Sequence, residues 1–138
     1  MVVVITGASG GIGAAVAERL AARDAVVVLV ARREDALRSV AGRCGARAVA
    51  MVADAIARFG HIDVWVNNVG QGITRNPTQL TDDDIDEIMR VNVKSALYGM
   101  QEVLPHFQQR NAGHIINVSS MLGRTPCAPF RGRPGGAA

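Results

Sequence analysis

A short apolar run that passes directly into a glycine-rich turn opens the chain and constrains its fold more than any other feature. Val2 to Ile5 is an uninterrupted β-branched run, which is typical of a strand buried on both faces of a parallel sheet. The glycine-rich segment Thr6–Gly13 reads TGASGGIG, and after its glycines Ile12, Val16 and Leu20 recur at helical spacing. The order predicts a strand, a tight turn and an amphipathic helix whose N-terminus faces the turn.

The rest of the chain repeats this alternation of apolar runs and amphipathic segments. Further strands are predicted at 25–30, 46–52, 62–66 and 115–118. A helix is predicted from Glu34 to Gly42 or Gly45, because acidic residues favour a first turn and glycine ends helices. The pattern indicates an α/β fold with an incomplete, doubly wound parallel sheet of about five strands in three α/β/α layers.

A long helix is predicted over 82–110. Thr81 is placed to cap its first turn, and the three aspartates that follow oppose the positive end of the helix dipole. An apolar stripe runs through the segment, with Pro105 predicted as a kink or stop and Gly113 as a boundary. Because no domain boundary is evident, residues 1–130 are expected to form one domain, and 131–138 (RGRPGGAA) an irregular tail.

Composition narrows the classes of function. At 138 residues and 49% hydrophobic content, the chain is long enough for one buried core, and its apolar runs are too short to span a membrane. We therefore expect a cytoplasmic protein that does not bind membranes. The net charge of +3 comes from scattered arginines without interleaved aromatic residues, so nucleic-acid binding is not expected. Cys44 and Cys127 form no CxxC motif and the three histidines are far apart, so no metal site is expected.

The Thr6–Gly13 turn has the properties of a phosphate-binding loop. Glycines let the backbone approach an anion, while free amides and the helix dipole attract it. The spacing is Gly-x3-Gly-x-Gly, and a purely structural turn is the alternative interpretation; the strand before and the helix after favour a Rossmann-like dinucleotide site. The predicted cofactor-binding residues of the loop are Thr6, Gly7, Ser9, Gly11, Ile12 and Gly13.

These residues resemble the TGxxxGxG signature of the short-chain dehydrogenase/reductase family, and four later landmarks follow in order. Asp54 matches the family's aspartate beside the adenine, and Asn67-Asn68-Val69-Gly70 resembles its NNAG motif, which adds Asn67 and Gly70 to the expected cofactor contacts. Asn92 and Ser120 resemble two of the family's four catalytic residues. The resemblance covers about the N-terminal 120 residues.

The end of the second predicted strand indicates the cofactor. An acidic residue there holds the ribose hydroxyls of NAD, whereas arginine accommodates the extra phosphate of NADP. The chain has Arg32 and Arg33 at this point, and guanidinium groups bind phosphate through paired donors. NADP is therefore predicted in preference to NAD, with two merely solvated arginines as the alternative.

The chain departs from the family pattern in two places, as if truncated and internally deleted. The family's tyrosine and lysine, which supply and tune the proton donor, would fall near 133 and 137, where this chain has Arg133 and Ala137. Its single lysine and single tyrosine, Lys94 and Tyr98, are expected to be ordinary helix residues. Only residues 55–61 lie between Asp54, which closes the third predicted strand, and Ile62, where the fourth begins, whereas a parallel crossover needs about a dozen. The third strand is thus expected to be displaced, mispaired or joined by a strained link, and a spliced or frame-shifted product of a longer gene is our hypothesis.

The resemblance implies an NADP-dependent oxidoreductase that transfers hydride between the nicotinamide and a carbonyl or alcohol. Because the family's proton donor is missing, we expect negligible turnover by this chain alone. The alternative is an inactive dinucleotide-binding module or truncated isoform that pairs with a full-length reductase. Besides a small-molecule substrate, the expected partner is a second copy or a relative, bound through the 82–110 helix.

Overall fold

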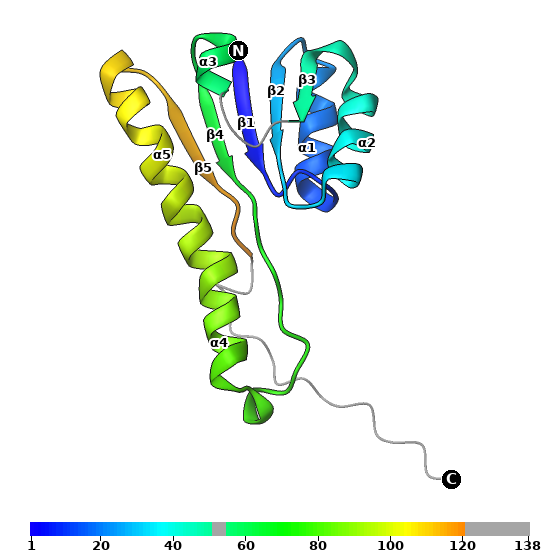
Figure 1. Ribbon diagram of the computed structural model, residues 1–138, viewed down its shortest axis with the longest axis vertical. Helices are drawn as coiled ribbons and strands as arrows, with labels where there is room; N and C mark the ends of the chain where they lie inside the picture. The colour runs from blue at the N-terminus through cyan, green and yellow to red at the C-terminus, as the bar shows by residue number, and fades with distance from the viewer. Residues whose placement is uncertain (51–54, 121–138) are drawn as a thin grey trace.

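A computed structural model describes residues 1–50 and 55–120 of the chain. In this part, five parallel strands form one sheet in the order β3-β2-β1-β4-β5 (Figure 1). The strands are β1 (Val2–Thr6), β2 (Val26–Val30), β3 (Ala48–Ala50), β4 (Val64–Asn67) and β5 (His114–Asn117). The helices are α1 (Gly11–Ala21), α2 (Glu34–Cys44), α3 (Ala55–Phe59), α4 (Asp82–Ile88) and α5 (Ser95–Arg110), with a π-helix at Met89–Lys94 and 3-10 turns at Gly45–Arg47 and Pro77–Gln79. The predicted α/β fold with a parallel sheet is confirmed.

Both faces of the sheet are covered at its centre, which explains the uninterrupted apolar runs there, whereas the edge strand β5 is largely exposed. In β1, Val3 and Ile5 pack into a cluster with residues of α1 and α2, such as Ala17. Val2 and Val4, which point to the opposite face, pack with residues of α5. Since successive side chains of a strand alternate between faces, a strand in the middle of three layers needs apolar residues at every position.

The third strand occupies a regular place in the sheet. It pairs in parallel with β2, with Val27 opposite Ala48, so our expectation of a displaced or mispaired strand was wrong, while the third alternative, a strained link, falls on residues 51–54 outside the described part. The strand begins at Ala48, later than the predicted 46, and its predicted end at 52 also lies outside the described part. The crossover to β4 contains α3, which is only one short helix. Residues 51–54, including the predicted adenine neighbour Asp54, lie outside the described part, as does the predicted tail at 131–138.

The long helix begins as predicted but continues differently. The Thr81 hydroxyl accepts a hydrogen bond from the Asp84 amide at 3.2 Å, and the Asp84 carboxylate accepts one from the Thr81 amide at 3.0 Å. The π-helix between α4 and α5 was not predicted. Nor does Pro105 stop the helix, which continues to Arg110. Pro105 and Gln101 are both exposed, so water can bond the Gln101 carbonyl that loses its amide partner.

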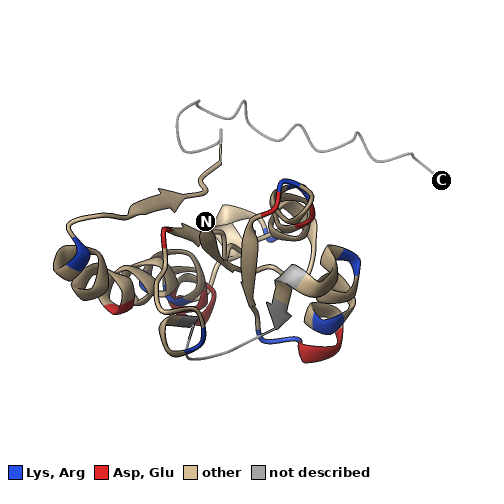
Figure 2. Cartoon of the chain, turned by 90° about the horizontal axis from the view of Figure 1, so that it is seen from above, with Lys and Arg blue, Asp and Glu red and all other residues tan. Residues whose placement is uncertain are grey.

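Charged residues lie on the helices and loops, with both signs mixed along the cartoon (Figure 2). No positive stripe is therefore evident among the residues drawn, and the expected absence of nucleic-acid binding stays a prediction. Across residues 1–50 and 55–120, no helix combines the length and the apolar character that a membrane crossing requires. The expected cytoplasmic location also stays a prediction.

Candidate cofactor-binding site

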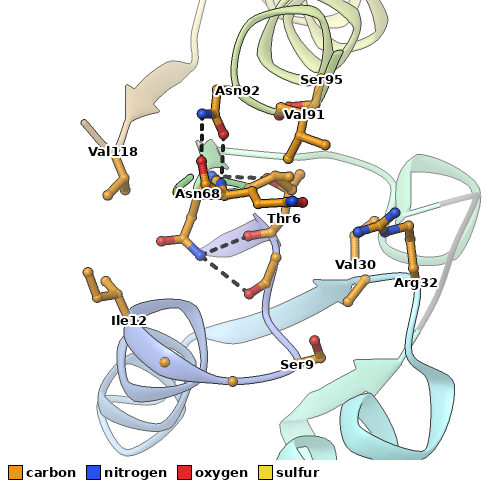
Figure 3. A pocket seen from close by; sticks show the side chains of 18 of the residues that line it. Thr6, Ser9, Ile12, Val30, Arg32, Asn68, Val91, Asn92, Ser95 and Val118 are labelled. Carbon is orange, nitrogen blue, oxygen red and sulfur yellow. Dashed lines mark hydrogen bonds between the residues drawn. The ribbon is translucent and has the colours of Figure 1, made fainter. Parts of the chain in front are cut away.

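A cleft lies at the carboxyl ends of the strands, where the chain changes direction across the sheet. From β1 the order runs through β2 to β3 on one side and through β4 to β5 on the other. Loops after β1 and β4 therefore leave in opposite directions and open a crevice between them, the usual ligand site of such sheets. Figure 3 shows this pocket, with Thr6 and Ser9 from the loop after β1, Arg32 after β2, and Asn92 from the π-helix.

The glycine-rich loop presents backbone amides to this pocket. Helix α1 begins at Gly11, and no side chain caps its first turn. The leading amides of a helix have no partner within the helix, so an uncapped end next to a pocket is suited to an anion. Gly11 has a φ of +55°, a conformation that glycine adopts without strain. Gly10 and Ile12 line the pocket beside it.

Gly13 lets α1 approach the loop closely. A Cβ atom at this position would lie 2.5 Å from the Asn68 amide nitrogen and 2.7 Å from the Gly7 carbonyl oxygen. The residue is buried and does not line the pocket, so it has a packing role in this structure, and its predicted contact with the cofactor stays a prediction. We call the Thr6–Gly13 loop, together with the start of α1, the cradle. Gly13 shapes the cradle indirectly, because it allows the start of α1 to pack against the loops after β1 and β4.

The two consecutive asparagines after β4 have different surroundings. Asn68 lines the pocket and its side-chain nitrogen donates to the carbonyl oxygens of Thr6 and Gly7 at 3.2 and 3.3 Å (Figure 3). Its backbone amide donates to the Thr6 hydroxyl at 3.0 Å, so Asn68 and Thr6 join the two loops. Asn67, the residue we predicted as a cofactor contact, is only 5% exposed and does not line the pocket. The side-chain oxygen of Asn67 accepts a hydrogen bond from the Trp65 indole nitrogen at 2.7 Å, and its side-chain nitrogen donates to the Asn117 side-chain oxygen at 2.8 Å.

Asn92 holds the loop after β4 against the π-helix. Its side-chain nitrogen donates to the Gln71 carbonyl oxygen at 2.8 Å, and its side-chain oxygen accepts from the Gln71 amide at 2.7 Å. The side chain thus pairs with the Gln71 backbone as a neighbouring strand would. A π-helix places its side chains differently from an α-helix and often marks functional positions. Here the π-helix carries both Asn92 and the buried Val91 at the pocket.

The pocket wall formed by β2 and the long helix is positively charged. Arg32, Arg33 and Arg90 line it, and none of the lining residues in the described part is acidic. Arg33 donates to the Ser9 hydroxyl at 3.3 Å and so connects the end of β2 to the glycine-rich loop. Arg90 donates to both carboxylate oxygens of Glu87, at 2.6 and 2.7 Å, and these hydrogen bonds hold the pKa of Glu87 below its usual value.

Most of the predicted site residues converge on this pocket. Those that line it are Thr6, Gly7, Ser9, Gly11, Ile12, Arg32, Arg33, Gly70, Asn92 and Ser120. Three residues that line the pocket were not predicted from the sequence: Asn68, Gln71 and Arg90. Asn68 belongs to the motif at Asn67 to Gly70. Had the strand been predicted to end at Asn67, Asn68 would have been expected at the start of the following loop and therefore at the cleft. No local signal points to Gln71 or Arg90, since both come to the pocket through tertiary contacts.

Two other predictions concern residues away from the pocket. Lys94 and Tyr98 do not line it, and Tyr98 is 61% exposed, as an ordinary helix residue is. Within residues 1–50 and 55–120, the structure contains no cluster of three or more histidine, cysteine, aspartate or glutamate side chains that could bind a metal ion.

Comparisons with known proteins agree with this geometry. The chain is 36% identical over 138 residues to an uncharacterized oxidoreductase of Staphylococcus epidermidis, an alignment that spans 91% of this chain and 60% of the relative. A metagenomic short-chain oxidoreductase solved with NADP is 34% identical, with a TM-score of 0.84 over 93% of this chain and 66% of that one. A 3-ketoacyl-(acyl-carrier-protein) reductase of Brucella melitensis solved with NADH is 32% identical, with a TM-score of 0.82 over 89% and 58% of the two chains.

This chain thus spans about 60% of the length of the curated relatives it matches. A sequence model described as short chain dehydrogenase matches residues 1–131. That match covers most of the chain, and it includes the glycine-rich loop, the Asn67–Gly70 motif and Ser120. The chain therefore belongs to the short-chain dehydrogenase family of oxidoreductases.

Proposed function

We propose that this chain binds NADP(H) and forms the cofactor-binding part of a short-chain oxidoreductase site for a carbonyl or alcohol substrate. The observation that carries the proposal is the uncapped N-terminus of α1, which meets an open pocket at the point where the sheet order reverses. The amides of Gly11 and Ile12 are placed to hold the pyrophosphate. The solved relatives bound to NADP and NADH support the class of ligand.

Charge supports NADP over NAD. Arg32 and Arg33 line the pocket directly after β2, where the ribose of a dinucleotide lies in folds of this kind. Guanidinium groups bind a phosphate through paired, charge-assisted hydrogen bonds, whereas the carboxylate that selects NAD would repel it. Arg33 is also held by Ser9, so its guanidinium is already near the loop.

The catalytic machinery of the described part is incomplete. When bound, the nicotinamide supplies or accepts a hydride. Ser120 lines the pocket and its hydroxyl is suited to hold a carbonyl oxygen, while Asn92 positions the loop at Gln71. Proton transfer needs a group of suitable pKa within hydrogen-bond reach, and the described lining residues include no Tyr, Lys, His, Asp or Glu. We therefore expect binding of NADPH with negligible turnover.

A fluorescence titration tests the proposal. NADPH emission should change in a saturable way on addition of the chain, and excess NADH should compete weakly. A panel of ketones should then cause no protein-dependent NADPH oxidation. Absence of saturable binding would contradict the proposal. Oxidation that persists in Ser120→Ala would show that Ser120 is not part of the catalytic group.

A second candidate function is pairing with a full-length reductase or a second copy. The long helix exposes an apolar stripe, in which Ile85, Met89, Val93 and Leu97 are 49, 44, 40 and 48% exposed. Four large apolar side chains at intervals of four residues lie along one side of a helix, and exposed apolar surface of this kind marks association sites. Sedimentation velocity should show a species heavier than a monomer that Leu97→Asp dissociates and that the control Gln109→Asp, at an exposed position outside the stripe, does not.

A further inference from the structure

A third arginine lines the pocket, and it comes from a distant segment. Arg90 belongs to the π-helix, yet it lines the same pocket as Arg32 and Arg33, which follow β2. No motif in the sequence singles it out. It therefore adds a positive charge to the pocket that the loop and the end of β2 do not provide.

Arg90 is already engaged by a carboxylate. Its Nε and Nη2 atoms donate to the two oxygens of Glu87 at 2.7 and 2.6 Å, in a two-pronged pair. The same fork binds phosphate oxygens, so a carboxylate and a phosphate compete for it. The side chains of Arg90 and Glu87 are 54 and 40% exposed, and a pair this exposed is only marginally stable against exchange of partners.

Glu87 also lies within the electrostatic influence of Arg32. Both arginines lower the pKa of Glu87: Arg90 does so mainly by hydrogen bonding, and Arg32 by its charge alone. One carboxylate thus interacts with arginines that reach the pocket from two different elements. A ligand phosphate between these arginines would gain from both of them and would be repelled by Glu87.

We infer that the Glu87–Arg90 pair sets how strongly the pocket discriminates between NADP and NAD. Glu87 occupies the guanidinium that the 2′-phosphate of NADP would otherwise share with Arg32, so it weakens the binding of NADP relative to NAD. Arg90 acts in the opposite sense and is a further specificity-determining residue. The inference rests on the proposed function, because it concerns the same dinucleotide site.

Binding constants for the two reduced coenzymes test this inference without any turnover. Glu87→Gln should tighten NADPH about three- to tenfold and change NADH less than about twofold, because only NADPH carries the additional phosphate. Arg90→Gln should weaken NADPH selectively by a similar factor. Added salt should reduce both effects, since these charges are exposed.

The chain offers a closely matched control. Glu18 is also 40% exposed and pairs with Arg43 at 2.7 Å, and neither residue lines the pocket. Glu18→Gln makes the same change in net charge, so it should leave the ratio of the two binding constants unaltered. If Glu87→Gln shifts NADPH and NADH equally, or shifts neither, the inference is overturned while the proposed function stands. If the unmodified chain binds neither coenzyme, the proposed function fails, and the inference with it.

Discussion

Replacing Gly13 with alanine tests whether the cradle depends on close contact between α1 and the two loops. The added Cβ atom would lie 2.5 Å from the Asn68 side chain and 2.7 Å from the Gly7 carbonyl oxygen, and the second of these is a backbone atom. Relief requires α1 or the loop to move, and overpacking of this kind costs about 1–3 kcal/mol. The better helix propensity of alanine returns about 0.5–1 kcal/mol. We expect the free energy of unfolding to fall by about 1–2 kcal/mol.

Gly42→Ala is the matched control for this substitution. Gly42 also lies inside a helix, but no atom is within 4 Å of its added Cβ. Alanine there should raise the free energy of unfolding by about 0.5–1 kcal/mol. The two variants should therefore differ by about 2–3 kcal/mol, which corresponds to roughly 10 °C in Tm for a chain of this size.

Thermal and denaturant unfolding measure the stability of each variant, and titration with NADPH measures whether the cradle still binds the coenzyme. Gly13→Ala should lose affinity for NADPH because the Thr6–Asn68 contacts must shift, whereas Gly42→Ala should bind as the unmodified chain does. A Gly13→Ala variant that is as stable as Gly42→Ala would refute the steric argument. Undiminished NADPH binding in that variant would refute the link between helix packing and the cradle.

Three further substitutions have distinct expected outcomes. Arg32→Asp should weaken NADPH at least about tenfold and NADH much less in the same titration, because a carboxylate repels the 2′-phosphate; an equal loss would contradict this. Asp63 accepts the Val2 amide at 2.7 Å, and this bond lowers its pKa. Its stabilising contribution is therefore full above about pH 4 and is lost as the pH falls through the lowered pKa, so Asp63→Asn should flatten the dependence of stability on pH below about pH 4, as measured by urea unfolding. Thr81→Ala should cost about 1 kcal/mol in thermal unfolding through loss of the capping box, whereas the exposed control Thr74→Ala should cost little.

Much of the fold and part of the site could be predicted from local sequence. The run from Val2 to Ile5 predicted a doubly buried strand, and the glycines after it predicted the turn at the start of α1. Thr81 predicted the start of the long helix, because its hydroxyl accepts a hydrogen bond from a backbone amide only three residues away, that of Asp84. Each of these features depends on residues that are close together along the chain, so the local sequence is enough to predict it.

The features that could not be predicted depend on long-range placement. The predicted strand bounds left only residues 55–61 for the link and so suggested a misplaced β3, whereas β3 pairs regularly with β2 and residues 51–63 separate Ala50 from Val64, which is enough for a parallel crossover. The π-helix also escaped prediction, since the apolar period of the long helix continues across it. That local change of winding brings Asn92 to Gln71, which is 21 residues away.

The sequence by itself determined that this protein builds a parallel sheet with a glycine-rich turn between its first strand and its first helix. Only the tertiary structure decided that Asn68 rather than Asn67 faces the pocket, and that Arg90 joins Arg32 there. The reason is physical. Backbone propensity, capping and apolar periodicity act over a few residues, whereas the neighbours of a side chain at the end of a strand depend on the order of strands and the path of a distant helix.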